Sequence, residues 1–517
     1  MPKIKETCST LQRFPHIFDE PGQLSKALDP FTVTTSNGFL PVVTPNSYLH
    51  VPNVFQPLGS LLSRLPVAKH DGSPGLLATY GLGPAVLEEL PDLTDEVNKL
   101  VTEDGKPDLF MITAIFRDYS FLCSAYLLEP CWERWSKDHE AGYGLGREVL
   151  PRSIARPLYR CAELVARLDI PPFMSYAASY ALYNYTLDNP SQGLEYSNMR
   201  LVRAFEKGLN PKSSEAGFIL THVDMVKESG ALVSGAIRIL DTLEKGQGAR
   251  DRQEVNDGFR EILRGMERVE NCMEDMWKNS KPADYLSFRV FIFGITSQSM
   301  FPNGVIYEGV NDDQPLHFRG ESGANDSMIP LLDHLLQIPM PSTPLTKILH
   351  EFRSYRPRPQ REFLSHVAAK AEEVGVQDFS VQDPETVLLY LKVLDHVRSF
   401  RWRHWLLTRE YIIKRTPHPT ATGGSPIITW LPNQLFAVLE LMISIHDKYV
   451  APITSHEIPP NIGTNGSGTT KASQKNVEKL ESFYYYRAQA EDMMTLVRDQ
   501  KEKLDREVAR WCKERGV

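Results

Sequence analysis

Residues 399–412 read SFRWRHWLLTREYI and end a longer segment, 385–413, in which apolar residues recur every three or four positions. That period is typical of an α-helix with one apolar face. His404 lies on this face together with Phe400 and Leu407. An imidazole on an apolar face is costly unless a neighbouring group bonds to it or a metal coordinates it. The segment therefore predicts a buried helix whose histidine has a specific partner.

The helix alone leaves two interpretations of His404 open. From the periodicity, a core histidine satisfied by a neighbouring side chain is favoured over a metal or haem ligand. Arg401, one helical turn earlier, favours haem, because an arginine beside the helix can pair with a propionate while the imidazole binds the iron. His396 lies off the apolar face and is expected to be solvated.

Helical periodicity continues through most of the chain. The other segments that show it are 107–135, 175–187, 216–245 and 249–278. We therefore expect a mainly α fold with two domains. The smaller, mixed but mostly helical N-terminal domain would span residues 1–165, and a large all-helical C-terminal domain would span 166–517. Residues 451–475, rich in Gly, Pro, Ser and Thr, are expected to form a flexible segment.

Composition excludes several functional classes. Of 517 residues, 42% are hydrophobic and 24% charged, which is typical of a soluble globular protein. A net charge of −8 argues against nucleic-acid binding, and no apolar run is long enough to span a membrane. The N-terminus lacks the apolar stretch of a secretory signal, and the six cysteines show no CxxC pair. A cytoplasmic protein without a zinc knuckle is expected.

Three further motifs each have two interpretations. RGESGAND at 319–326 resembles a nucleophile elbow around Ser322, but the polar segment before it, broken by Pro315, disfavours a serine hydrolase. ATGGSP at 421–426 is either a mobile loop that approaches a ligand or an ordinary connection, and spacing alone favours the latter. Arg289, within the apolar FRVFIFG, forms either a structural salt bridge or a ligand contact.

Taken together, several segments resemble the indoleamine 2,3-dioxygenase family, haem enzymes that open the pyrrole ring of tryptophan. The segments, in the order of the family, are DIPPFMSYAASYALYNY, GFILTHVDMVKESG, FRVFIFG, GVIYEGV, HFRGESGANDSMIPLLDHLL, YRPRPQREFL, FRWRHWLLTREYI and ATGGS. Each segment alone is a weak sign of the family, but their shared order and approximate separations are highly specific. The likeness covers most of the large domain, and the first 150 residues carry less of it.

The resemblance implies roles for five residues. His404 is similar to the proximal ligand that binds the iron of one haem b per chain. Arg401 is similar to the arginine near a haem propionate, and Asp333 to its acidic partner. Arg289 corresponds to the arginine that receives the substrate carboxylate. Thr422 corresponds to the loop threonine that helps to hold the amino-acid end of the substrate.

On the opposite, distal side of the haem, the resemblance implies that Phe218 is a pocket aromatic. Ser322 and Gly323 fall in the family's segment over the haem. The smaller N-terminal domain is expected to cover this side.

Two positions depart from the family pattern. His222 stands where many members have a distal serine, and it is expected to contact dioxygen or the indole N–H. Two consecutive aromatics of the family appear here as Asp284 and Tyr285, so only Tyr285 keeps the ring.

The function that the resemblance implies is a dioxygenase that converts L-tryptophan to N-formyl-L-kynurenine, the entry step of the kynurenine route to NAD. Its partners would be tryptophan, dioxygen and an electron donor that keeps the iron ferrous, and a monomer without nucleic acid or membrane is expected. Two alternatives are a haem-binding paralogue with low turnover that senses or binds a ligand, and a helical interaction protein without a cofactor.

Overall fold

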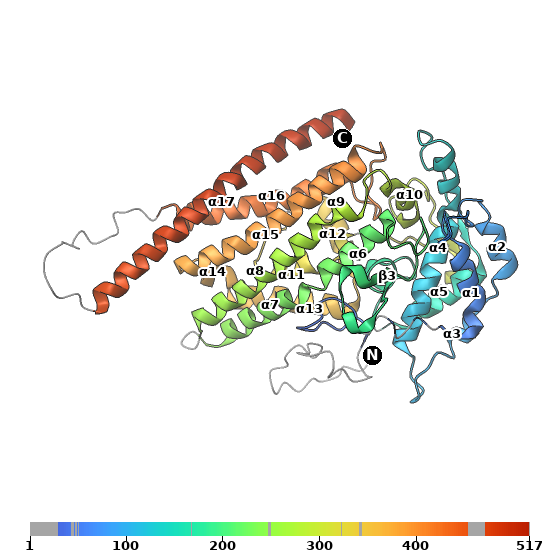
Figure 1. Ribbon diagram of the computed structural model, residues 1–517, viewed down its shortest axis with the longest axis horizontal. Helices are drawn as coiled ribbons and strands as arrows, with labels where there is room; N and C mark the ends of the chain where they lie inside the picture. The colour runs from blue at the N-terminus through green and yellow to red at the C-terminus, as the bar shows by residue number, and fades with distance from the viewer. Residues whose placement is uncertain are drawn as a thin grey trace.

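The computed structural model describes residues 29–42, 46, 49, 51–166, 168–246, 250–321, 323–340, 344–452 and 471–515. The described chain is mainly α-helical, as predicted, and its strands are two or three residues long (Figure 1). Most of the expected flexible segment, 451–475, lies outside the described residues.

The α-helices are α1 (Gln56–Arg64), α2 (Leu82–Glu89), α3 (Thr94–Val97), α4 (Leu109–Lys137), α5 (Arg152–Leu164), α6 (Ser214–Val226), α7 (Ser229–Glu244), α8 (Arg252–Glu274), α9 (Met276–Asn279), α10 (Tyr285–Arg289), α11 (Met328–Leu335), α12 (Pro344–Ser354), α13 (Arg358–Val374), α14 (Val376–Ser380), α15 (Pro384–Thr408), α16 (Ile427–Ile445) and α17 (Lys471–Arg515). Single π-helical turns occur at η3 (Tyr176–Tyr180), η10 (Arg409–Ile413) and η11 (His446–Val450). The strands are β1 (Val149–Leu150), β2 (Tyr185–Leu187), β3 (Met199–Leu201) and β4 (Ile306–Tyr307).

The long helix α4 is the centre of the N-terminal part of the chain. Residues 112–129 of this helix are all buried, which explains why its sequence is apolar on every side. Helices α1, α2 and α5 pack against it, and these elements gather at one end of the molecule (Figure 1). The side chain of Asp108 caps the helix by accepting a hydrogen bond from the Met111 N–H at 3.0 Å.

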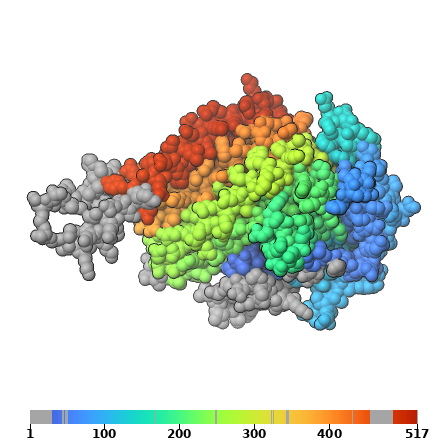
Figure 2. All heavy atoms as spheres, viewed as in Figure 1, coloured from blue at the N-terminus to red at the C-terminus, as the bar shows by residue number. Residues whose placement is uncertain are grey.

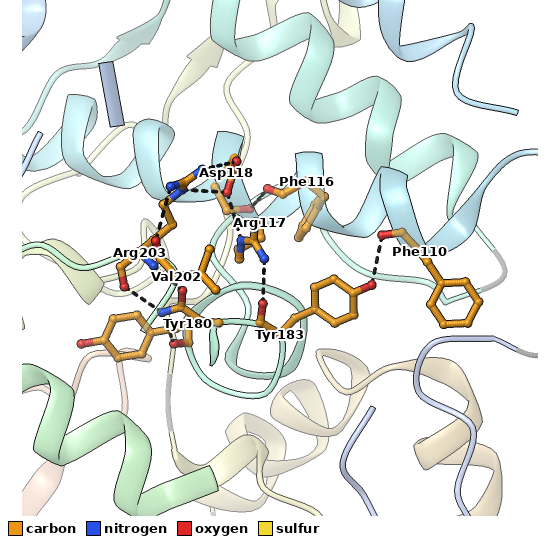
Figure 3. A network of polar contacts seen from close by, with 10 residues as sticks. Phe110, Phe116, Arg117, Asp118, Tyr180, Tyr183, Val202 and Arg203 are labelled. Carbon is orange, nitrogen blue, oxygen red and sulfur yellow. Dashed lines mark hydrogen bonds and ion pairs between the residues drawn. The ribbon is translucent and has the colours of Figure 1, made fainter. Parts of the chain in front are cut away.

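A buried ionic cluster ties α4 to the segments that follow it (Figure 3). Arg203 donates to both carboxylate oxygens of Asp118, at 2.9 and 2.7 Å, and Arg117 donates to the same carboxylate at 3.0 Å. Burial alone would raise the pKa of Asp118, but the two guanidinium groups hold it below its ordinary value. Arg117 also donates to the Tyr183 carbonyl at 3.0 Å. The cluster therefore anchors the chain just after η3.

The predicted helix at 175–187 is wrong beyond Tyr180. After the single turn of η3 the chain becomes strand β2, which pairs antiparallel with β3. The Asn184 side chain stabilises this bend by donating to the carbonyls of Tyr180 and Arg203. This pairing involves residues more than ten positions away, so a local helical period did not indicate it.

The expected domain boundary near residue 165 falls just after α5. Across it, β1 pairs in parallel with β4, so the two parts of the chain share a pair of strands. The larger part is dominated by helices, although it was expected to be all-helical and contains β2, β3 and β4.

Helix α15 lies inside the larger part and packs against α8, α16 and α17. It begins sharply because Pro384 occupies its first turn and the Asp383 carboxylate accepts from the Glu385 and Thr386 N–H groups, each at 3.1 Å. Helix α17 runs along the outer face of α15 and α16 and forms a ridge there (Figures 1 and 2). The residues quoted first, 399–412, therefore belong to the end of a helix that is covered on several sides and to the turn η10 that follows it.

His396 shows how this packing changes a local expectation. It was expected to be solvated, but its Nδ1 lies 2.7 Å from the Glu270 carboxylate on α8 and its side chain is 21% exposed. The expectation was wrong because α8 covers that face of α15.

Among the described helices, none combines the length and the apolar character that crossing a bilayer requires.

Candidate functional site

A cavity of about 260 Å³ brings together most of the predicted site residues. Its walls come from α6, α8, α10, α11, α12, α15 and α16 and from the loops around residues 321–326 and 421–425. Apolar side chains dominate the lining, including Phe218, Met273 and Leu407. A mainly apolar cavity with a few polar groups is the usual form of a small-molecule site.

Helix α15 carries His404 into this cavity. Within the described part of the chain, no side chain or carbonyl forms a hydrogen bond with its imidazole. Burial, and then the charge of Arg401, lowers the pKa of His404 to about 4, so the imidazole is neutral at pH 7. A neutral imidazole keeps a nitrogen lone pair for a metal. A core histidine satisfied by a neighbour does not describe this residue.

Asp333 on α11 holds the neighbouring arginine of α15. The Nη2 of Arg401 donates to both Asp333 oxygens, at 2.8 and 2.7 Å. Burial raises the pKa of Asp333 above its ordinary value, and Arg401 opposes that shift. The Nη1 of Arg401 is buried and has no partner among the described residues. This orphaned donor fits one further anionic oxygen, such as that of a haem propionate.

Two cationic residues of the cavity were not predicted from the sequence, Arg353 and Arg356. Arg353 contacts the Met340 sulfur at 3.6 Å and, within the described chain, forms no ion pair with a carboxylate. Arg356 donates to the carbonyls of Asn325 and Asp326 at 3.2 and 3.1 Å. Their three-residue spacing, with Arg356 inside YRPRP and Arg353 just before it, was a usable signal, because it places two cations together.

Replacing Asp333 by alanine is expected to destabilise the haem-free chain by about 3 kcal/mol, because Arg401 would remain buried without a counter-charge. Haem should reduce this loss by offering a propionate to the arginine. Chemical unfolding of the haem-free and haem-loaded forms measures both effects, with the exposed Asp275→Ala as control. An equal loss in the two forms would show that no propionate reaches Arg401.

Arg289 is completely buried at the end of α10, but it has few partners. Its Nη2 donates to the Thr420 carbonyl at 2.8 Å, and its guanidinium lies 4.6 Å from the centre of the Phe293 ring. The Nε and Nη1 atoms have no hydrogen-bond partner, and no carboxylate of the described chain pairs with this arginine. A structural salt bridge is therefore absent there, and the two free donors fit an incoming carboxylate.

The ATGGS loop, for which the sequence left a mobile loop and an ordinary connection open, is anchored against the cavity. Thr422 lines the cavity, and its hydroxyl donates to the Glu321 carbonyl at 2.6 Å. The Gly294 N–H donates to the Thr422 carbonyl at 2.9 Å, and Arg319 donates to the Gly423 carbonyl at 3.1 Å. Because the hydroxyl proton is used on Glu321, Thr422 can only accept from a ligand, as it would from a substrate ammonium group.

The remaining predicted residues form an aromatic wall. Phe218 and Tyr285 line the cavity with ring centres 5.3 Å apart, and Gly323 also faces it. Tyr176 from η3 joins them, and its buried hydroxyl has no partner among the described residues. Ser322 lies outside the described residues.

His222 lies between two members of this wall. Its ring meets those of Phe218 and Tyr176 edge-on, at 4.8 and 6.2 Å between centres. Burial, and then His404, lowers the pKa of His222 to about 4. Asp284, the other departure from the family pattern, does not line the cavity and accepts a hydrogen bond from Ser214 at 2.7 Å.

Glu321 is a cavity residue that no sequence motif indicated. It is 4% exposed, and within the described chain its carboxyl has neither a hydrogen bond nor an ion pair. Burial raises the pKa of Glu321 to about 8.

Replacing Glu321 by glutamine is expected to stabilise the folded chain at pH 8 but hardly at pH 5. Between the ordinary pKa of 4.5 and about 8, the unfolded chain releases the proton that the folded chain keeps, so stability falls as the pH rises. The amide removes this loss, on the order of 2–4 kcal/mol at pH 8. The free energy of unfolding at both pH values, with the exposed Glu267→Gln as control, measures the gain. The same gain at pH 5 as at pH 8 would contradict a raised pKa of Glu321.

The donor set suits haem better than a bare metal ion. In the described residues, no group of three or more His, Cys, Asp and Glu side chains is placed to hold a metal. One unpartnered imidazole, an apolar lining and an arginine with a free donor are instead what a haem needs from a protein.

Known proteins are similar to this chain over much of its length. A family model described as Indoleamine 2,3-dioxygenase matches residues 27–426. Indoleamine 2,3-dioxygenase 1 of Mus musculus is 28% identical over 356 residues, which cover 68% of this chain and 81% of the mouse protein. Indoleamine 2,3-dioxygenase of Saccharomyces cerevisiae is 26% identical over 380 residues, 69% of this chain and 78% of the yeast protein.

The name of a third relative specifies a hydroxylated form of tryptophan. The 6-hydroxytryptophan 2,3-dioxygenase fscD of Fusarium equiseti is 23% identical over 393 residues, 75% of this chain and 85% of its own length. Similarity to this chain is therefore shared by proteins whose names specify different substrates.

Proposed function

The chain belongs to the indoleamine 2,3-dioxygenase family, and from this premise we propose that it inserts dioxygen across the indole C2–C3 bond of L-tryptophan to give N-formyl-L-kynurenine. Family membership supports the coarser statement, a haem-dependent dioxygenase that acts on tryptophan-like substrates. The observation that carries the proposal is the imidazole of His404, which lines the cavity and has no partner in the described chain. Arg289 does not itself line the cavity, but it bonds to the carbonyl of Thr420, next to the lining residues Ala421 and Thr422, and keeps two buried donors without a partner. The reaction is the first step of the kynurenine route to NAD.

We propose that His404 binds the iron of one haem b. Arg401, already held by Asp333, would give its free Nη1 to a propionate. Arg353 lines the same cavity and would supply a second cation. Haem, when bound, supplies the iron at which dioxygen is activated toward the electron-rich indole.

The remaining residues orient the substrate. Arg289 would bind the carboxylate through its Nε and Nη1, and Thr422 would accept from the ammonium group. Tyr285 and Phe218 would pack against the indole, and this apolar wall would exclude water from the reacting atoms. Gly323 leaves room there, because a Cβ at this position would meet only the His222 ring, at 4.0 Å.

The proposal extends to the architecture and the partners. Residues 1–165 would form a domain that covers the distal side, and 166–517 the domain that binds haem. The working protein would be a monomer and would need an electron donor that keeps the iron ferrous.

The test is turnover by the haem-loaded, reduced protein. Incubation with L-tryptophan and ¹⁸O-labelled dioxygen should give N-formylkynurenine that carries both labelled atoms. Haem-free protein is the control. Product with label in one atom, or no product from fully loaded ferrous protein, would contradict a dioxygenase.

A haem-binding paralogue with low turnover is the second candidate. The observation that favours it is the presence of two polar side chains, His222 and Glu321, next to the aromatic residues Phe218 and Tyr285 of the cavity lining. It predicts a tryptophan-induced change of the haem spectrum without N-formylkynurenine.

A further inference from the structure

Glu321 is a buried carboxyl in the cavity that the proposed reaction does not use. Another buried glutamate, Glu215, shows what a structural carboxyl looks like in this fold: it accepts hydrogen bonds from the backbone N–H groups of Phe205 and Glu206, at 2.7 to 3.0 Å. The Glu321 carboxyl has no such partner in the described chain. Burying a polar group without a hydrogen bond is costly, so this carboxyl is available to bond a polar group of a molecule that enters the cavity.

The backbone around Glu321 is fixed by close packing. A Cβ at Gly320 would lie 2.3 Å from the Gly294 nitrogen and 2.6 Å from the Thr422 carbonyl oxygen, so only glycine lets these three segments meet. The Thr422 hydroxyl also donates to the Glu321 carbonyl. The carboxyl is therefore held at the cavity by the loop that would bind the amino-acid end of the substrate.

The cavity lining shows which residues lie around the carboxyl. Glu321 lines the cavity together with Tyr176, Phe218 and Tyr285. The electrostatics agree with this placement, because the charge of Glu321 contributes to raising the pKa of the hydroxyls of Tyr176 and Tyr285, whereas burial is the only cause that shifts the pKa of Glu321 itself. Glu321 therefore belongs to the aromatic wall, where the ring of an amino acid anchored at Arg289 would lie.

We infer that Glu321 forms a hydrogen bond with a hydroxyl group on the indole ring of the substrate, so that the chain prefers a ring-hydroxylated tryptophan to tryptophan itself. The inference rests on the proposed function, from which it takes an amino acid held at Arg289 with its ring in the cavity. An unsubstituted benzene ring against Glu321 removes water from the carboxyl and returns no hydrogen bond. A phenolic hydroxyl donates and accepts, and so does a carboxyl that keeps its proton at pH 7.

The experiment compares L-tryptophan with its 4-, 5-, 6- and 7-hydroxy derivatives on the haem-loaded protein. Kd is measured by calorimetry and kcat/KM by consumption of the indole. At least one hydroxylated substrate should be favoured over tryptophan by about tenfold or more in both quantities. Glu321→Ala should bring the ratio close to one, and Glu321→Gln, which still donates and accepts, should keep part of it. Asp284→Asn, outside the cavity lining, is the matched control and should leave the ratio unchanged.

The outcomes separate this inference from the proposed function. A wild-type preference that persists in Glu321→Ala, or no preference at all, overturns the inference even if tryptophan is cleaved. An equal loss for every substrate in Glu321→Ala also overturns it, because the carboxyl would then contact a group that all of them share, such as the indole N–H. If hydroxylated tryptophan binds more tightly than tryptophan, this preference depends on Glu321, and no substrate is turned over, the inference is supported and the proposed dioxygenase activity is overturned. Absence of binding by every substrate overturns both.

Discussion

Replacing His404 by alanine is expected to weaken haem binding by more than about 100-fold and to abolish dioxygenase activity with it. Loss of an outer partner of a metal ligand already costs 10- to 100-fold, and loss of the ligand itself costs more. His404 is neutral, faces the cavity and has no partner in the described chain, so no hydrogen bond of the described residues depends on its imidazole. Haem titration followed by the Soret absorption measures the change.

His222 provides the matched control, because it is a second neutral imidazole in the same cavity. His222→Ala should keep haem affinity within a few-fold of wild type. Added imidazole should restore the Soret band of the His404 variant by filling the space that the side chain leaves. The assignment would be reversed if the His222 variant lost haem and the His404 variant kept it.

Replacing Arg289 by alanine is expected to lower kcat/KM for L-tryptophan by about 2–4 kcal/mol, or roughly 30- to 1000-fold. The guanidinium is buried and offers its free Nε and Nη1 to one carboxylate, a planar contact that lysine reproduces poorly. Arg289→Lys should therefore recover only part of the loss. Steady-state kinetics of both variants measure it.

Tryptamine separates a carboxylate contact from a general effect on folding. It has the indole and the amine of tryptophan but no carboxylate, so its kcat/KM should change little in Arg289→Ala. A similar loss for tryptamine and tryptophan would mean that Arg289 supports the wall rather than the substrate. Its hydrogen bond to the Thr420 carbonyl shows how it would do so.

Helix α15 shows how much of the fold a sequence predicts. Its apolar face, its capping Asp383 and its length are local properties, and the expected helix at 385–413 agrees with the observed helix and the turn that follows it. The helix predicted at 175–187 is wrong beyond Tyr180, because the structure there depends on distant residues. Its helical period is real, but the bend at Asn184 and the pairing of β2 with β3 depend on distant residues.

Some residues of the candidate site could likewise be recognised from the local sequence, and others could not. Periodicity placed His404 on an apolar face, and the resemblance to a family supplied its proposed role, whereas spacing alone had favoured an ordinary core histidine. Arg289 was recognisable because a charge within an apolar segment needs a partner. Glu321 was not, because RGESGAND is a polar stretch that reads as an exposed loop. Its burial comes from the contact of Gly320 with Gly294 and the 421–424 loop, segments far apart in the sequence.

The absorption spectrum of the purified, haem-loaded chain, recorded with and without L-tryptophan, tests the central claim most directly. If His404 binds haem and the same cavity receives the substrate, a Soret band will be present and tryptophan will shift it, with a smaller response in Arg289→Ala at the same tryptophan concentration. A chain that takes up no haem, or a Soret band that is indifferent to saturating tryptophan, would contradict the account.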